Sequence, residues 1–271
     1  MTQLRAITER SQVIVPCGTG GVGKTSVAAA LGVVAAQQGR RVVVVTIDPA
    51  RRLLDAIGLD DNVGNGIQQV PLDSVGELWV TMLDVRETFD SLVRDTSQTV
   101  ERANEVMENS FYRSLSKSLS GTRDYMAAER LYNLHNDPRF DLVIVDTPPS
   151  RNALDFLESP ERLARFLKHP IVRFLVAPSR GGFRLANAAM QPVLKAISGI
   201  VGGDALTGAA AFLRAFDGME TEFSRRALAV ASTLRSDATH FVIVTAPAPD
   251  ALIEADHFVS ELSRLRISLQ H

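Results

Sequence analysis

Apolar runs alternate with a helical pattern along the N-terminal part of the chain. Residues 12–15 form a short apolar run that ends at a proline and a glycine-rich segment, and residues 42–47 form an unbroken, mostly β-branched run. Residues 25–38 between them are mostly alanine, valine and leucine and stop before Gly39, which is typical of a helix with a glycine at its end. A strand that is apolar on both faces belongs in a parallel sheet covered by helices. These residues therefore predict one strand–helix–strand unit.

The remaining pattern predicts more elements of both kinds. Apolar residues recur at helical spacing between residues 159 and 235, with prolines and glycines between them and no strand-like run. The fold class expected is α/β: a mostly parallel sheet flanked by helices, in a single domain over residues 1–271, with a helical subdomain inserted at about 85–135 and 159–235. Further strands are predicted at residues 78–83, 142–145 and 241–244, and further helices at 84–107, 123–135 and 250–264.

The composition narrows the class of protein. The chain carries 29 Lys and Arg against 31 Asp and Glu, a formal net charge of −2, so it has no overall basic field for nucleic acid. Cys17 is the single cysteine, which excludes an intrachain disulfide and a thiolate metal cage. No uncharged apolar run reaches the roughly 18 residues that span a bilayer, and the first ten residues are too polar for a secretory signal. We therefore expect a cytoplasmic protein without an integral membrane segment.

A glycine-rich motif follows the first predicted strand. Its glycines allow successive backbone N–H groups to point at phosphate oxygens, and the following helix N-terminus favours anions. Lys24 would hold the β- and γ-phosphates, and the Thr25 hydroxyl would bind Mg²⁺. The competing interpretation is a chance glycine-rich turn, but the position between a strand and a helix favours a phosphate loop. The residues that match G-x-x-x-x-G-K-[ST] are Gly18, Thr19, Gly20, Gly21, Val22, Gly23, Lys24 and Thr25.

Two aspartates follow apolar strands, at the edge where α/β sheets bind ligands. Asp146 directly follows the run at 142–145, which is the Walker B arrangement of a carboxylate near the metal. Asp48 follows the run at 42–47. Either aspartate could instead cap a helix, and Asp48 with Pro49 behind it suits a helix start well.

Four segments resemble a known family. GGVGKTS at 20–26, TIDPARRL at 46–53 and VDTPPSRNALDFL at 145–157 are similar to the P-loop, switch I and switch II of the arsenite-pump and tail-anchored-protein-targeting ATPases. Residues 241–255 resemble a late strand and loop of the same family. The resemblance implies a P-loop NTPase that hydrolyses ATP to ADP and phosphate with Mg²⁺, with the nucleotide at a dimer interface.

The resemblance also assigns roles residue by residue. Lys24 and Asp48 would be catalytic, with Asp48 orienting or deprotonating the attacking water, and Thr25 and Asp146 would support the metal. The segment that senses the γ-phosphate would be Thr147, Pro148, Pro149, Ser150, Arg151 and Asn152. The nucleotide would be bound by Gly18, Thr19, Gly20, Gly21, Val22, Gly23, Lys24, Thr25 and Ser26.

The sequence also departs from the family pattern. Thr19 stands where the family normally has a second lysine that reaches the partner's nucleotide, and Ala248 stands where a glutamate is common. Arg51 or Arg52 could replace the lost cation, although arginines remote from the phosphate are the commoner case. A heterodimer whose related partner supplies the lysine would explain both departures. The chain stops at His271, before the strand expected to carry an adenine-contacting asparagine, so truncation is one expectation.

What the ATPase would drive is less sharply defined. A single cysteine excludes the usual arsenite site of several soft thiolates. Residues 166–216 are rich in apolar side chains, which either pack on one another and the sheet or form a groove for a hydrophobic protein client, such as a transmembrane segment.

Three functions remain open at this point. The first is a dimeric ATP-hydrolysing switch, homodimeric or paired with a paralogous ATPase, that binds a hydrophobic client. The second is a catalytically weak nucleotide-binding subunit of a heterodimer. The third is a ParA-like DNA-associated ATPase, which would need a basic dimer surface; the charge balance leads us to expect no nucleic-acid partner.

Overall fold

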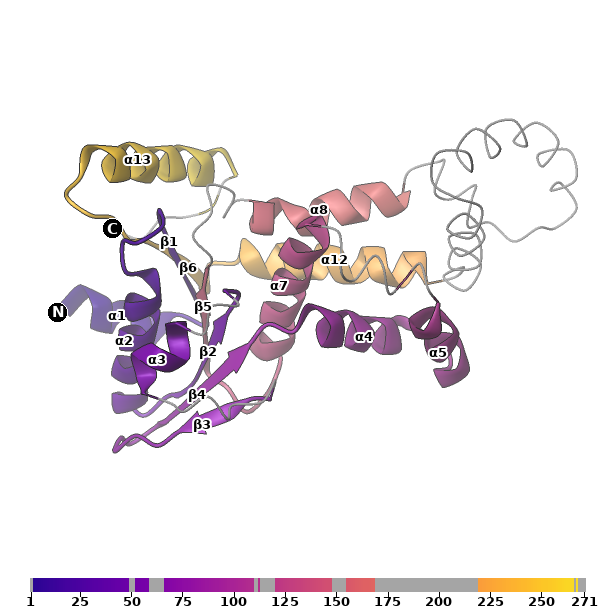
Figure 1. Cartoon of the computed structure of the whole chain (residues 1–271), viewed down its shortest axis with the longest axis horizontal. Coiled ribbons are helices and arrows are strands. Elements are labelled where there is room, and N and C mark those ends of the chain that lie inside the picture. The colour runs from indigo at the N-terminus through magenta and orange to yellow at the C-terminus, as the bar shows by residue number, and fades with distance from the viewer. Residues whose placement is uncertain are drawn as a thin grey trace, which may run out of the picture. The chain divides into compact units, whose positions relative to one another are not determined.

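The computed structural model of the chain divides into two compact units, which are described separately (Figure 1). Unit 1 contains Met1–Asp84, Asp124–Pro160 and Ala229–His271, and unit 2 contains Val85–Arg123 and Glu161–Leu228. That the two units form one domain with an inserted subdomain stays a prediction. The structure describes residues 2–48, 52–58, 66–109, 112, 120–147, 155–168, 219–265 and 267.

Unit 1 is built on a six-stranded sheet in the order β3-β4-β2-β5-β1-β6. All neighbouring strands are parallel except β3 and β4, which are antiparallel. The predicted α/β class with a mostly parallel sheet is thereby confirmed. The strands are β1 (Val13–Cys17), β2 (Arg41–Thr46), β3 (Gln68–Val70), β4 (Glu77–Met82), β5 (Leu142–Asp146) and β6 (Thr239–Ile243). The helices wholly in unit 1 are α1 (Thr2–Arg10), α2 (Lys24–Gln37), α3 (Arg52–Ile57) and α13 (Pro249–Arg264).

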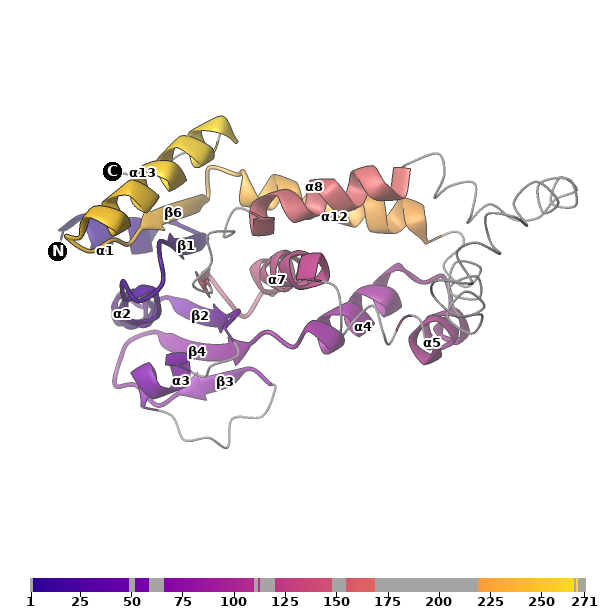
Figure 2. The same ribbon diagram turned by 45° about the horizontal axis from the view of Figure 1, so that its top comes forward.

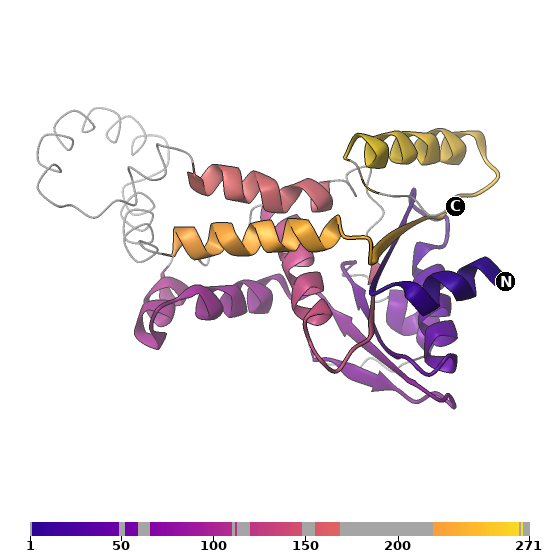
Figure 3. The same ribbon diagram turned by 180° about the vertical axis from the view of Figure 1, so that it is seen from behind.

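Alternate side chains of the central strands are buried on opposite faces of the sheet. On one face Ile14, Val44 and Ile144 pack with apolar residues of α1, α2 and α3. On the other face Val43 and Val145 pack with α7 (Ser120–His135) and with the unit 1 parts of α8 (Asp155–Lys168) and α12 (Glu220–Leu234). Figure 3 shows α2 and α7 on opposite sides of these strands. The unbroken apolar runs of the sequence therefore reflect strands covered on both faces.

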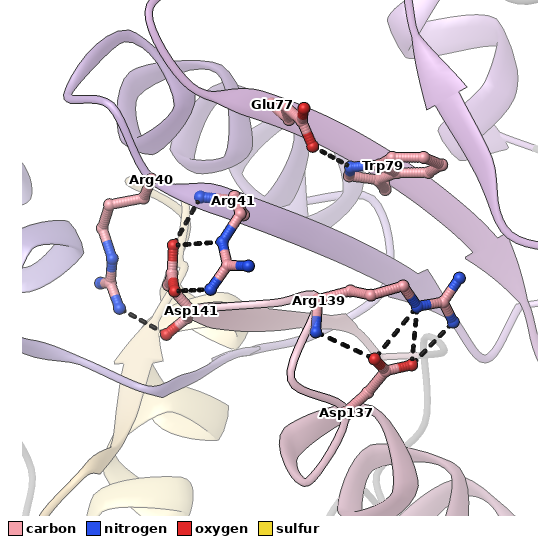
Figure 4. A network of polar contacts seen from close by, with 7 residues as sticks. All are labelled: Arg40, Arg41, Glu77, Trp79, Asp137, Arg139 and Asp141. Atoms are coloured by element: carbon pink, nitrogen blue, oxygen red, sulfur yellow. Dashed lines mark hydrogen bonds and ion pairs between the residues drawn. The ribbon is translucent and has the colours of Figure 1, made fainter.

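Polar contacts join the amino ends of the strands (Figure 4). Arg41 on β2 donates to both carboxylate oxygens of Asp141, which directly precedes β5, at 2.6 and 3.2 Å. Arg40 donates to the carbonyl oxygens of Thr8, Ser11 and Asp141, the second at 2.6 Å. These bonds tie the C-terminal end of α1 to the central strands, at the end of the sheet opposite to the glycine-rich loop.

The strand predicted at residues 12–15 continues through Pro16 to Cys17. The prediction ended the strand too early because proline cannot donate a ladder hydrogen bond. Here β1 pairs with β5 only at Val13 and Ile14, so no N–H is needed at Pro16, and its carbonyl oxygen accepts a hydrogen bond from the Thr147 hydroxyl at 2.7 Å. The first helix and the edge strand β3 were not predicted.

Unit 2 contains two helices where the sequence predicted one over residues 84–107. They are α4 (Val85–Thr96) and α5 (Val100–Glu108), which follow one another in Figure 2. The break falls at Thr99, whose backbone is extended. Its side-chain oxygen caps α5 by accepting from the Arg102 N–H at 3.2 Å. Tyr112 donates to the Asp90 carboxylate of α4 at 2.6 Å. Among the helices that the structure describes, none combines the length and the hydrophobicity of a membrane-spanning segment.

Candidate nucleotide site

The glycine-rich loop lies between β1 and α2, at the carboxyl end of the sheet. None of the backbone N–H groups from residues 19 to 23 donates a hydrogen bond to another described residue. Such N–H groups before a helix N-terminus are suited to bind an anion. The loop comes very close to β6: the Val244 N–H donates to the Cys17 carbonyl oxygen at 2.7 Å, and a Cβ on Gly18 would lie 2.0 Å from the Val244 carbonyl oxygen.

Lys24 is buried at the start of α2, and its side chain folds back over the loop. Its Nζ donates to the carbonyl oxygens of Gly18 and Thr19 at 2.9 and 2.8 Å. Burial lowers the pKa of Lys24, and the nearby Asp146 carboxylate opposes that shift. The ammonium group of Lys24 is therefore held at the loop. It would lie close to an anion bound by the backbone N–H groups of the loop.

Asp146 lies fully buried at the end of β5 and accepts two hydroxyl hydrogen bonds. Thr25 donates to Oδ1 at 3.1 Å and Thr46 donates to Oδ2 at 3.0 Å. Burial raises the pKa of Asp146, while the two hydroxyl groups lower it. The Thr25 hydroxyl and the Asp146 carboxylate are hard oxygen donors, which is the ligand chemistry that Mg²⁺ prefers, so the residues present fit this metal.

Asp48 follows β2 and is partly buried. Its backbone N–H donates to Thr46 Oγ1 at 3.2 Å. Its negative charge acts to raise the pKa of both Lys24 and Asp146. The structure therefore brings Asp48, Lys24 and Asp146 together. Pro49, which would begin a helix capped by Asp48, lies outside the described residues, and α3 is described from Arg52.

The remaining predicted residues are only partly described. Thr147 is buried next to Asp146. Ser26 is exposed on the first turn of α2. The other residues predicted to sense the γ-phosphate lie outside the described part of the chain: Pro148, Pro149, Ser150, Arg151 and Asn152.

Sequence reasoning missed the role of Thr46 at this site. Its hydroxyl contacts both the Asp146 carboxylate and the Asp48 backbone. The signal was present, because a threonine ends the apolar run directly before the aspartate segment. A side chain between two candidate aspartates could have been singled out on that ground.

A mostly parallel sheet with a glycine-rich loop between its first strand and a helix, and a buried aspartate on the neighbouring strand, defines the class of P-loop nucleotide-binding proteins. A family model described as "Anion-transporting ATPase" matches residues 11–271. The chain therefore belongs to this family of ATPases.

Curated relatives match about half of the chain. A protein named "ATPase ASNA1 homolog 1" from Paramecium tetraurelia is 29% identical over 150 residues, which cover 55% of this chain and 44% of the relative. "Arsenical pump-driving ATPase" from Escherichia coli is 30% identical over 157 residues, which cover 56% of this chain and 26% of the relative. The chain matches less than half the length of these curated relatives.

Proposed function

We propose that this chain binds ATP with Mg²⁺ and hydrolyses it to ADP and phosphate. The observation that carries the proposal is the convergence of Lys24, Thr25 and Asp146 beside a loop whose backbone N–H groups donate to no other described residue. The loop and Lys24 would bind the phosphates. Thr25 and Asp146 would hold Mg²⁺, which when bound supplies positive charge to the phosphate oxygens. Asp48 would orient the attacking water.

Substitution of the loop lysine tests this proposal. Lys24→Met should lower ATP hydrolysis by about a hundred-fold or more, because a lost donor to the reacting charge has an effect of that order. Lys168→Met is the matched control, since Lys168 is an exposed lysine at the end of α8. Phosphate release by the wild-type chain and both variants is the measurement. Equal rates for wild type and Lys24→Met would refute the proposal.

We further propose that the protein is a dimeric switch that binds a hydrophobic protein client through unit 2. Within this unit, Val100, Phe166 and Leu228 expose 72%, 61% and 45% of their surface. Large exposed side chains of this kind suit an apolar partner. Most of the apolar segment at 166–216, on which the client hypothesis rested, lies outside the described residues.

Photocrosslinking to a hydrophobic peptide, with and without Mg²⁺ and an ATP analogue, tests the client proposal. Phe166→Ser should reduce labelling, and Val75→Ser should not, because Val75 is 89% exposed but belongs to unit 1. Sedimentation in the same two nucleotide states tests the dimer. Labelling that ignores both the nucleotide and Phe166 would contradict the proposal.

A second candidate is a catalytically weak subunit that depends on a paralogous partner. It is favoured by Thr19, an uncharged residue whose carbonyl oxygen accepts from Lys24. Arg52 contributes, as the smallest cause, to the lowered pKa of Lys24, and its side chain is exposed. Single-turnover hydrolysis by the isolated chain, with Thr19→Lys beside it, separates the two. A weak subunit would be inactive alone and gain activity from the substitution or the paralogue.

A further inference from the structure

Thr46 occupies a position between the two aspartates of the candidate site. It is the last residue of β2, and the parallel pairing of β2 with β5 places it opposite Asp146. Only 1% of its surface is exposed. A buried hydroxyl must form hydrogen bonds within the protein, so its partners show what it holds in place.

The hydroxyl of Thr46 joins Asp146 to Asp48. It donates to Asp146 Oδ2 at 3.0 Å and accepts from the Asp48 N–H at 3.2 Å. The Asp48 carbonyl oxygen lies at 3.4 Å and competes for the single hydroxyl proton. The carboxylate is closer and charged, so it is the acceptor of the hydrogen bond that the hydroxyl donates. The other lone pair then remains free to accept from Asp48.

A second contact supports the same arrangement. The Ile47 N–H donates to the Asp146 carbonyl oxygen at 3.0 Å. Because Thr25 occupies Asp146 Oδ1, the carboxylate is connected through one oxygen to the glycine-rich loop and through the other to the segment that leads into Asp48. The backbone bond at Ile47 joins the end of β2 to β5, whereas the Thr46 hydroxyl contacts both the Asp146 carboxylate and the Asp48 N–H.

We propose that Thr46 is a positioning residue for hydrolysis: its hydroxyl fixes the Asp48 backbone relative to the Asp146 carboxylate. This inference rests on the proposed ATPase function. Without the hydroxyl, Asp48 loses one contact that holds its backbone, and its carboxylate is held less precisely where it orients water. Binding of the nucleotide and Mg²⁺ depends on the loop, Lys24, Thr25 and Asp146. The change leaves the first three intact, and Asp146 keeps its hydrogen bond from Thr25. The rate of hydrolysis therefore depends on Thr46 more strongly than nucleotide affinity does.

The test uses Thr46→Val, which keeps the shape and removes the hydroxyl, and Thr46→Ser, which keeps the hydroxyl. Thr46→Val should lower the single-turnover rate about ten-fold, which corresponds to about 1.4 kcal/mol. The Kd for Mg²⁺ with a non-hydrolysable ATP analogue, measured by calorimetry, should change less than about two-fold, as expected when binding contacts are intact. Thr46→Ser should restore most of the rate.

Thr239→Val is the matched control. Thr239 is also a buried strand threonine, and its hydroxyl donates to the Thr233 carbonyl oxygen at 2.7 Å and lies 3.3 Å from the Ser236 hydroxyl. It begins β6, at the amino end of the sheet, so its loss should leave the hydrolysis rate unchanged. If Thr46→Val does not fold, Thr46→Cys replaces it, because a thiol is of similar size and a weak hydrogen-bonding group.

Each outcome is decisive. An unchanged rate in Thr46→Val, with an active wild type, overturns the inference and leaves the ATPase proposal intact. Rate and affinity falling by the same factor would make Thr46 a binding residue and also overturn it. An equal loss in Thr239→Val would show a general effect of destabilisation. A wild-type chain that hydrolyses nothing, alone or with a paralogue, refutes the ATPase proposal itself.

Discussion

Substitution of Gly18 by alanine tests how closely the glycine-rich loop is joined to the sheet. A Cβ at this position would lie 2.0 Å from the Val244 carbonyl oxygen. The same Cβ would lie 3.2 Å from a methyl carbon of Val22. Two such atoms normally stay more than 3 Å apart, so the backbone of the loop or of the segment after β6 must move. The Val244–Cys17 hydrogen bond lies next to this contact and would break with it.

The expected cost follows from these contacts. Overpacking in a close-packed region costs about 1–3 kcal/mol, and the lost backbone hydrogen bond adds about 1 kcal/mol. A side chain at positive φ adds about 1–2 kcal/mol, since Gly18 has φ 155°. Gly18→Ala should therefore lower the free energy of unfolding by about 4 kcal/mol.

Gly21→Ala provides a control in the same loop. Gly21 also has positive φ, at 82°, but a Cβ there meets no atom within 4 Å. It should cost only the backbone strain, about 1–2 kcal/mol. The difference between the two variants isolates the contact with Val244.

Urea unfolding followed by tryptophan fluorescence is the assay. Trp79 is the chain's single tryptophan, and it lies on β4 of unit 1 with its ring 6.2 Å from that of Phe140. Its emission therefore reports the unit that contains the loop. Equal destabilisation by Gly18→Ala and Gly21→Ala would refute the close approach on which the argument rests.

Three further outcomes are expected. Burial raises the pKa of the Cys17 thiol to about 12, so iodoacetamide at about pH 8 should label it only after unfolding, and fast labelling of folded protein would be inconsistent with the structure. Hydrogen bonding from Arg41 lowers the pKa of Asp141, so its stabilising effect should be present above about pH 4 and fade below it. The difference in unfolding free energy between wild type and Asp141→Asn should accordingly be smaller at about pH 3 than at about pH 6. Thr99→Ala should destabilise α5 by about 1 kcal/mol, seen as faster amide exchange in that helix, whereas Thr99→Ser should not.

The central strands and the loop could be predicted from the sequence because several signals agreed. The β-branched run at 42–47 has no polar face, so it could only be a covered parallel strand, and the structure buries Val42 to Val45 almost completely. The glycine-rich motif lay between a strand and a helix, as the chemistry requires. Local propensity, periodicity and motif context all pointed to the same arrangement.

Other features depended on tertiary contacts that no local pattern contains. The edge strand β3 has three residues, and its sequence QQV has no distinctive alternation. The helix predicted over 84–107 is amphipathic throughout, so the break at Thr99 was hidden by a continuous pattern. The hydroxyl partners of Asp146 come from residues 100 and 121 positions away in the chain. Only the register of β2 and β5 brings Thr46 to that carboxylate.

The segments of the two units alternate along the chain, and this order restricts how the protein can be shortened. Unit 2 comes from two separate stretches, and residues 124–160 between them return to unit 1 and contain β5. A single deletion that removes all of unit 2 would therefore also delete Asp146 and the middle of the sheet. Loss or exchange of unit 2, in the laboratory or in evolution, therefore requires two separate excisions, one on either side of β5.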